Sequence, residues 1–297
     1  MERNQAFAVL GGDARQFSLI AHLAATGAEV RVFGLPSQAP LAGVTLFDDW
    51  REAVVGSGVI VLPLPASPDG VRVNCPLLPD VPPVMLSELF KQAPPDAVFV
   101  GGRFSPAVKD MAEREGRELL DYCKCEGFLL KNAVPTAEGA VSILMDRLPR
   151  TVSGMSVAVT GYGRVARALC ELLVAMGAQV TVGARKKEAL LEAAKAGCRT
   201  LLLCGDDSVV QLCRGKHAVF NTVPHWIFSR EVLSSISPDL LLVDLASAPG
   251  GVDGEAARAL GVPVIWALSL PGKYAPVSAG EIIADTVLSL IGKENDP

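Results

Sequence analysis

Few side chains that could act as a general acid or base lie at the end of a predicted strand in this sequence. The chain has three histidines, and of these His225 follows closely on an apolar strand, 218–221. His22 falls inside a predicted helix, and His217 opens a strand. Histidine takes up and releases protons near neutral pH more readily than any other side chain. We therefore take His225 as a candidate acid–base or substrate-binding group, with a structural loop histidine as the alternative.

A second set of polar side chains precedes the final predicted helix, 279–291. The stretch LPGKYAPVSAG at 270–280 is predicted to be a loop and contains Lys273 and Ser278. The N–H groups at the start of the helix, together with the ammonium of Lys273, would attract a carboxylate. Lys273 is accordingly a candidate for catalysis and Ser278 for substrate binding.

Two arginines, Arg15 and Arg103, lie just beyond predicted strands of the first half, 6–10 and 97–100. The carboxyl ends of parallel strands meet at one edge of a sheet, where ligands bind. Because a guanidinium binds a carboxylate through two parallel hydrogen bonds, Arg15 and Arg103 are candidate substrate-binding residues. Together with Lys273 they would suit a small dicarboxylate.

The segment 124–146 is the predicted hinge between two halves of the chain. Its sequence NAVPTAEGA at 132–140 contains a helix start signal, with Thr136 as the expected N-cap. A helix that crosses between domains borders the cleft between them. This places Glu138 among the catalytic candidates and Asn132 and Thr136 among the substrate-binding candidates. Capping and interdomain hydrogen bonding are the alternative roles.

A glycine-rich turn marks the strongest motif, SVAVTGYGRVARALCELLVAMGAQVTVGAR at 156–185. A strand, a turn, a helix and a second strand within about 30 residues form the dinucleotide-binding βαβ unit. Gly161 permits the tight turn, Gly163 lets backbone approach a pyrophosphate, and Ala166 lets the helix pack closely. The helix N-terminus would hold the phosphates. The candidate cofactor-binding residues of the turn are Gly161, Tyr162, Gly163, Arg164 and Val165.

The end of the second strand of this unit indicates which dinucleotide binds. An NAD site carries an acidic residue there for the ribose hydroxyls, whereas this strand runs into Arg185, Lys186 and Lys187. Arginine binds phosphate bidentately, so the pattern favours the 2′-phosphate of NADP, with NAD left open. The alternative is that the cluster is a solvated entry to the next helix.

Later strand ends of the second half supply further cofactor candidates. The strand 218–221 is followed by Thr222, Val223 and Pro224. The strand 240–244 ends at Asp244, followed two residues later by Ala246. Asp244 has two open roles, binding the cofactor or capping the next turn.

The first half repeats the build of the second. Gly11 to Gly27 and Gly161 to Gly177 each span sixteen positions, and GAEVRVFG mirrors GAQVTVGA. Asp13 and Gln16 stand where the second half has Gly163 and Ala166, and a carboxylate there disfavours pyrophosphate. The first half is therefore expected to be a substrate domain or scaffold.

Alternating strands and helices predict an α/β fold with two Rossmann-like lobes. The second lobe is expected to be a doubly wound parallel sheet that binds the dinucleotide. The expected domains are residues 1–130, an interdomain helix at 131–150, and the dinucleotide-binding domain at 151–297, whose final helix is free to pack back on the N-terminal lobe. The predicted strands are 6–10, 29–33, 59–62, 97–100 and 118–121, then 156–160, 179–182, 200–203, 218–221, 240–244 and 264–267.

Composition excludes several classes of protein. Of the 297 residues half are hydrophobic and 20% are charged, as in a compact globular protein. The net charge of −5 argues against nucleic-acid binding, and no apolar run has the length of a membrane span. Seven cysteines in mostly apolar segments fit reduced thiols and a cytoplasmic location. Cys123 and Cys125 form the one close pair, so no metal site is expected.

Five stretches together resemble the family of dipicolinate synthase A subunits. They are GGDARQ at 11–16, NAVPTAEGA at 132–140, GYGRVA at 161–166, DLASAPGGVD at 244–253 and LPGKYAPVSAGEII at 270–283. The resemblance implies NAD(P)-linked oxidation of a dihydrodipicolinate-type cyclic dicarboxylate to pyridine-2,6-dicarboxylate. It also implies that the partner is a flavoprotein-like B subunit and that the location is the mother cell of a sporulating bacterium. Homo-oligomerisation is left open.

Two other functions fit parts of the pattern. The two-lobed plan also resembles dehydrogenases of 2-hydroxyacids and alanine, so a linear hydroxy or amino acid is an alternative substrate. A nucleotide-binding regulatory subunit, with catalysis in its partner, is the alternative from another class. No Ser/His/Asp triad or P-loop occurs in the sequence.

Overall fold

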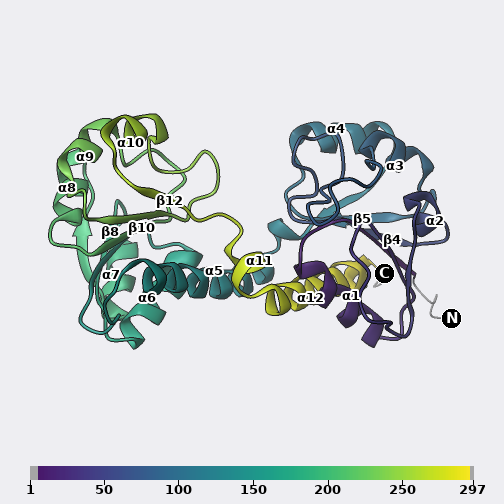
Figure 1. Ribbon diagram of the computed structural model, residues 1–297, viewed down its shortest axis with the longest axis horizontal. Coiled ribbons are helices and arrows are strands. Elements are labelled where there is room, and N and C mark those ends of the chain that lie inside the picture. Colours follow the sequence, from purple (N-terminus) through teal and green to yellow (C-terminus); the bar gives the residue numbers. More distant parts are fainter. Residues whose placement is uncertain (1–5, 295–297) are drawn as a thin grey trace. The chain divides into compact units, whose positions relative to one another are not determined.

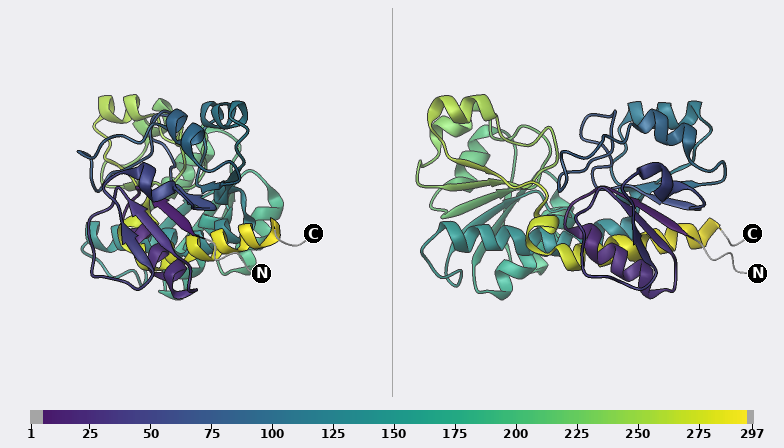
Figure 2. Two further views of the ribbon diagram at one scale, coloured as in Figure 1. Left: turned by 90° about the vertical axis from the view of Figure 1, so that its right-hand side faces the viewer. Right: turned by 45° about the vertical axis from the view of Figure 1, so that its right-hand side comes forward.

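The chain folds into two compact units, each built on one sheet. A computed structural model describes residues 6–294, and Figures 1 and 2 show its ribbon. One unit comprises Met1–Lys131 with Ala275–Pro297, and the other Asn132–Tyr274. Within the described residues each unit holds a six-stranded parallel sheet. The predicted α/β class with two Rossmann-like lobes is confirmed.

The first unit has the strand order β3-β2-β1-β4-β5-β6. Its strands are β1 (Phe7–Leu10), β2 (Val30–Phe33), β3 (Val44–Leu46), β4 (Val59–Val61), β5 (Val98–Gly101) and β6 (Leu119–Asp121). Central strands such as β1, with sequence FAVL, are buried throughout because helices cover both faces of the sheet. Helices α2 (Trp50–Val54), α3 (Leu86–Gln92) and α4 (Pro106–Arg114) cover one face, and α1 (Arg15–Ala25) and α12 (Pro276–Glu294) the other (Figure 1).

Helix α12 lies beside α1, and its apolar side chains complete the core of the first unit. Ile283, Ala284 and Val287 are buried with residues of α1 and β1. The approach is close at Gly280, where a Cβ atom would lie 2.2 Å from the carbonyl oxygen of Arg15. The last helix of the chain thus packs in the first compact unit, an arrangement that the sequence left open.

The second unit has the strand order β12-β11-β10-β7-β8-β9, which completes the expected doubly wound sheet. Its strands are β7 (Ser156–Thr160), β8 (Gln179–Ala184), β9 (Arg199–Leu202), β10 (Ala218–Asn221), β11 (Leu241–Asp244) and β12 (Val264–Trp266). Helices α5 (Glu126–Arg147), α6 (Arg164–Ala175) and α7 (Lys187–Lys195) pack on one face. Helices α8 (Asp206–Cys213), α9 (Arg230–Ser235) and α10 (Gly254–Leu260) pack on the other (Figure 1).

The predicted helix start at Thr136 is wrong. Helix α5 begins ten residues earlier, runs through Pro135 without ending, and contains the division between the two units at Lys131 and Asn132. Thr136 is therefore an interior residue, and its hydroxyl donates to the carbonyl oxygen of Asn132 at 2.7 Å. The Pro-Thr-Ala-Glu sequence resembles a start signal, but the buried face formed by Ala133, Ala137 and Ala140 carries the helix across it.

The predicted loop at 270–280 is mostly helical. Helix α11 (Leu270–Tyr274) and the first turn of α12 cover it, so Lys273 and Ser278 are both helical residues. Strand β3 and helices α2, α9 and α11 are short and were not predicted. Among the described residues, no helix combines the length and apolar character needed to cross a membrane.

Candidate functional site

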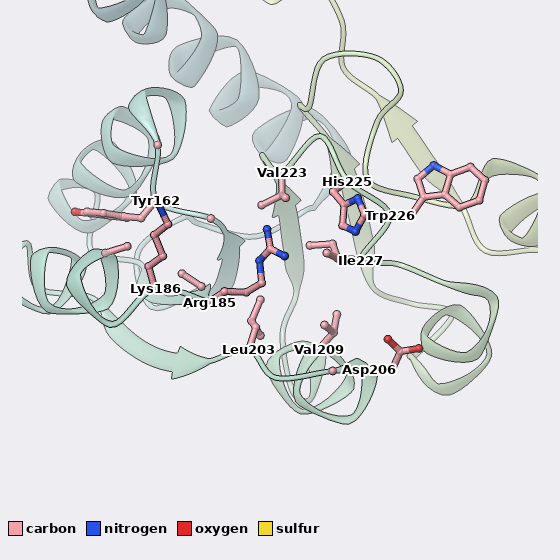
Figure 3. Close-up of a pocket in the computed structure, with 16 residues that line it drawn as sticks. Tyr162, Arg185, Lys186, Leu203, Asp206, Val209, Val223, His225, Trp226 and Ile227 are labelled. Carbon is pink, nitrogen blue, oxygen red and sulfur yellow. The ribbon is translucent and has the colours of Figure 1, made fainter.

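A pocket of about 430 Å³ lies at the carboxyl ends of β7, β8 and β10 in the second unit. This is where the strand order reverses, at the neighbours β7 and β10, and such switch points bind ligands in open α/β sheets. Four segments and Ala189 of α7 line the pocket (Figure 3). The segments are the turn Gly161–Gly163, the end of β8 at Gly183–Lys186, residues 203–209 around the start of α8, and the loop after β10 from Val223 to Ile227.

The glycine turn has the geometry that a close ligand approach requires. Gly161 has a φ of +82°, and a Cβ there would lie 2.9 Å from the side chains of Thr222 and Val223. Gly163 caps α6, and a Cβ built on it meets nothing within 4 Å. The backbone at Gly163 is thus open toward the pocket, as pyrophosphate binding needs. Arg164 begins α6 but does not line the pocket.

The remaining turn candidates differ in exposure. Val165 is half-buried in the first turn of α6 and also lies off the pocket. Tyr162 lines the pocket and is 8% exposed. Arg167 stacks its guanidinium on the Tyr162 ring at 5.2 Å, donates to the Tyr162 carbonyl at 3.3 Å, and pairs with Glu192 of α7. Burial raises the pKa of Tyr162 to about 12, so its hydroxyl stays protonated.

The cationic end of β8 faces the pocket. Arg185 and Lys186 are exposed, line the pocket and form no ion pair within residues 6–294. In Figure 3 the side chain of Arg185 extends between Val223 and Leu203. The acidic lining residue is Asp206, whose carboxylate accepts from Ser229 Oγ at 2.7 Å. The residues present therefore fit a nicotinamide dinucleotide, with two cations at the end of β8.

The loop after β10 brings His225 to the same pocket as the glycine turn. His225 and Trp226 are both exposed there, and Val223 lies opposite the turn. Thr222 holds the start of the loop, because its hydroxyl donates to the carbonyl oxygen of Thr160 at 2.7 Å. Pro224 does not line the pocket.

Asp244 and Ala246 are buried away from the pocket. The Asp244 carboxylate accepts from the Asn221 side chain at 2.7 Å, the Ala246 N–H at 3.0 Å and the Gly251 N–H at 2.9 Å. These bonds make Asp244 the cap of the turn after β11, the second of its two expected roles. Contact of Asp244 or Ala246 with a cofactor stays a prediction.

The equivalent turn of the first unit is filled by its own side chains. Asp13 Oδ1 accepts from the backbone N–H of Arg15, at the start of α1, and both carboxylate oxygens bind the Arg15 guanidinium at 2.8 Å. Arg15 also donates to the Leu64 carbonyl at 2.7 Å. The Asp13 carboxylate thus occupies a helix N-terminal N–H that a phosphate would use. Burial disfavours the charged form of Arg15, but the hydrogen bonds and charge of Asp13 outweigh it and raise its pKa.

Arg103 is exposed after β5, with a φ of +59°. The backbone N–H of Arg103 donates to Asp121 Oδ1 at 3.0 Å, and the guanidinium takes no part in that hydrogen bond. Burial raises the pKa of two thiols of the first unit, that of Cys123 beside Arg103 to about 12 and that of Cys75 to about 11. Both stay protonated near neutral pH, so neither is a thiolate nucleophile.

The other predicted catalytic residues do not share the pocket of His225. Glu138 is exposed and lines a shallow cavity between α5 and α6. Lys273 on α11 is exposed and lines neither cavity, and it belongs to the second unit. Ser278 is exposed in the first turn of α12 and belongs to the first unit, while Asn132 is half-buried on α5.

Sequence reasoning missed several residues of the site. Trp226, Leu203 and Val209 line the pocket, and Thr160 and Asn221 are fully buried polar residues behind its wall. Asparagine at the end of the apolar strand AVFN was the available signal. No group of three or more histidine, cysteine or acidic side chains within the described residues could hold a metal ion.

The fold is of the two-unit Rossmann type, with the pocket at the switch point of the second sheet. L-alanine dehydrogenase has the same fold, with a TM-score of 0.64 at 14% identity over 96% of this chain and 89% of its own. Residues 6–123 match the N-terminal domain of the dipicolinate synthase A subunit. Over its whole length the chain is similar to dipicolinate synthase A subunits, the family that the motifs resemble.

Two relatives show this similarity. The A subunit of dipicolinate synthase from Bacillus subtilis (strain 168) is 29% identical over 96% of this chain and 95% of its own length. The crystal structure of the A subunit of dipicolinate synthase from Bacillus halodurans superposes with a TM-score of 0.88 at 28% identity, covering all of both chains.

Proposed function

We propose that this chain is the NADP-linked A subunit of a dipicolinate synthase. It oxidises a dihydrodipicolinate-type cyclic dicarboxylate to pyridine-2,6-dicarboxylate with a flavoprotein-like B subunit, in the cytoplasm of the mother cell of a spore-forming bacterium. The observation that carries the proposal is the pocket that joins an open glycine turn to Arg185 and Lys186 in a chain similar to this family.

The chain's own groups divide the work of binding. Gly161 and Gly163 bring backbone and the α6 N-terminus to a pyrophosphate, and Arg185 and Lys186 receive a ribose 2′-phosphate. When bound, a nicotinamide dinucleotide supplies a two-electron hydride acceptor. A dihydropyridine ring becomes aromatic by releasing one hydride and one proton, so NADP⁺ held by these residues would take the hydride and a base of the chain would take the proton.

His225 is the proposed proton acceptor because it is the histidine that lines the pocket beside the glycine turn, and histidine is the side chain used most often as a general base. For the dicarboxylate, Arg103 offers an exposed guanidinium, whereas Arg15 is already bound to Asp13. Substrate roles for Asn132, Thr136 and Ser278, and catalytic roles for Lys273 and Glu138, are part of the same proposal.

The test is reconstitution with and without the B subunit. The chain is incubated with a dihydrodipicolinate precursor and NADP⁺ or NAD⁺, and the aromatic product and reduced cofactor are followed by ultraviolet absorbance. We expect product with NADP⁺ in preference to NAD⁺. Turnover of an open-chain hydroxy or amino acid in place of the cyclic substrate would overturn the substrate assignment. Cofactor binding without reduction in every combination would instead indicate a regulatory subunit.

A further inference from the structure

A chain of buried polar side chains runs across the ends of three neighbouring strands behind the pocket. Thr160 ends β7, Asn221 ends β10 and Asp244 ends β11, and none is more than 1% exposed. The Thr160 hydroxyl donates to Asn221 Oδ1 at 2.6 Å, and Asn221 Nδ2 donates to Asp244 Oδ1 at 2.7 Å. The surrounding strands are apolar, so this row of three polar side chains lies inside a hydrophobic core.

The Asn221 carboxamide also holds the backbone of Val223 at both ends. Its Oδ1 accepts from the Val223 N–H at 3.1 Å, and its Nδ2 donates to the Val223 carbonyl at 3.0 Å. The amide orientation is settled because the Val223 N–H is an obligatory donor. Both amide N–H groups of Asn221 and two acceptor positions are used, so each bond depends on the others.

The backbone of Gly251 packs closely against this amide. A Cβ on Gly251 would lie 2.1 Å from Asn221 Nδ2 and 2.6 Å from the Val223 carbonyl oxygen. The same Gly251 donates its N–H to Asp244 and accepts from the Ile227 N–H at 3.1 Å. The loop from Thr222 to Ile227 is therefore held at its start by Asn221 and at its end by Gly251.

This loop is the pocket wall that carries Val223 and His225. We propose that Asn221 is a positioning residue, which sets the dinucleotide affinity of the pocket by fixing the Thr222–Ile227 loop against the glycine turn. The proposal rests on the proposed function, because it assumes that the pocket binds a nicotinamide dinucleotide. Asn221 itself lies behind the wall and does not line the pocket.

Replacing Asn221 with aspartate gives a test with a pH signature. Asn221→Asp keeps the acceptor for Thr160 and the Val223 N–H, but it loses both donors and faces the Asp244 carboxylate. Two facing carboxylates share one proton at a higher pH than an isolated carboxyl does, and the shared proton restores one donor. We expect the variant to bind NADPH at least about tenfold more weakly than wild type at about pH 8, and to recover most of that loss at about pH 5.

Two further measurements separate positioning from general stability. Asn221→Ala should weaken NADPH binding at every pH and speed hydrogen exchange of the Val223 amide, whose acceptor it removes. Val219→Ala, two residues earlier on the same buried strand, should lower the unfolding temperature yet leave NADPH affinity and the Val223 exchange rate unchanged. If Asn221→Ala fails to fold, Asn221→Asp at the two pH values still decides.

The results that would refute the positioning role of Asn221 differ from those that would refute the proposed function. Wild-type protein that binds neither NADPH nor NADH would refute the proposed function. Wild-type binding with unchanged affinity in Asn221→Asp, or a loss that does not recover at lower pH, would refute the positioning role. A loss of affinity in Val219→Ala equal to that in Asn221→Ala would also refute it, since stability alone would then account for the effect.

Discussion

Arg185→Ala is the sharpest test of the cofactor assignment, because the side chain lines the pocket, is exposed and forms no ion pair within the described part of the chain. Its removal costs the protein no internal partner. The change should therefore appear in ligand affinity and leave the unfolding temperature of the unliganded protein close to that of wild type.

The magnitude follows from the chemistry of the contact. A hydrogen bond to a charged group contributes about 1.5–3 kcal/mol. Arg185 is exposed, so solvent and salt screen the attraction and the lower value applies. About 1.5 kcal/mol corresponds to a roughly tenfold weaker affinity for NADPH. NADH lacks the 2′-phosphate, so its affinity should change by less than about twofold.

Calorimetric or fluorescence titration with NADPH and NADH measures both affinities. Lys187→Ala is the matched control, since Lys187 is an exposed cation on the same segment that does not line the pocket. The NADPH difference should shrink as salt is raised, because screening weakens a charge contact. Unchanged NADPH affinity, or equal losses for both dinucleotides, would refute the 2′-phosphate assignment to Arg185.

Three further predictions concern stability. Asp13→Asn should lower the free energy of unfolding in urea by about 3–5 kcal/mol, because it leaves the buried Arg15 guanidinium without its carboxylate; a loss below about 1 kcal/mol would contradict this. Gly280→Ala should cost at least about 1–3 kcal/mol by forcing α12 away from the Arg15 carbonyl, whereas Gly292→Ala on the same helix, where a Cβ meets nothing within 4 Å, should be neutral or stabilising in the same assay. Backbone N–H hydrogen bonds lower the pKa of Asp69 to about 2. The small contribution of the ionised carboxylate to the free energy of unfolding is therefore present above about pH 4 and is lost as the pH falls toward 2. The unfolding temperatures of Asp69→Asn and wild type should therefore converge in acid, and a constant gap between them would argue against the assignment.

The glycine turn shows how far sequence reasoning reaches when the chemistry is local. The turn follows from residue type and spacing. A side chain at Gly161 would be strained by the positive φ and would meet Thr222 and Val223, whereas the missing Cβ at Gly163 leaves the backbone there open. The basic end of β8 is equally local, since Arg185 and Lys186 come directly after the strand that ends beside the turn.

Predictions that depended on a boundary were less accurate. Thr136 has the residue type and context of an N-cap, yet it lies inside α5 and bonds to the carbonyl oxygen four residues earlier. The buried alanine face of α5 outweighs the local signal. Lys273 and Ser278 were likewise placed in one loop, whereas they lie on two helices that belong to different compact units.

Arg15 illustrates a third limit. Its place after β1 suggested a cation available to a substrate, but Asp13, two residues away, binds it through both carboxylate oxygens. Pairs separated by two residues face each other in a tight turn but not in a regular helix, so the pairing depends on the turn at Gly11 and Gly12. The spacing by itself does not distinguish an arginine that is available to bind a substrate from one that is already paired with a carboxylate of the chain.

By itself, the sequence determined the two repeated βαβ units, the single intact glycine turn, the basic strand end and the family resemblance, because each depends on the type and spacing of neighbouring residues. The tertiary structure alone decided that α12 joins the first unit. It also decided that His225 shares the pocket of the glycine turn and that Asn221 holds the loop that carries His225. The physical reason is that these facts depend on which strands lie side by side, and parallel pairing brings together residues about sixty positions apart, as it does Thr160 and Asn221.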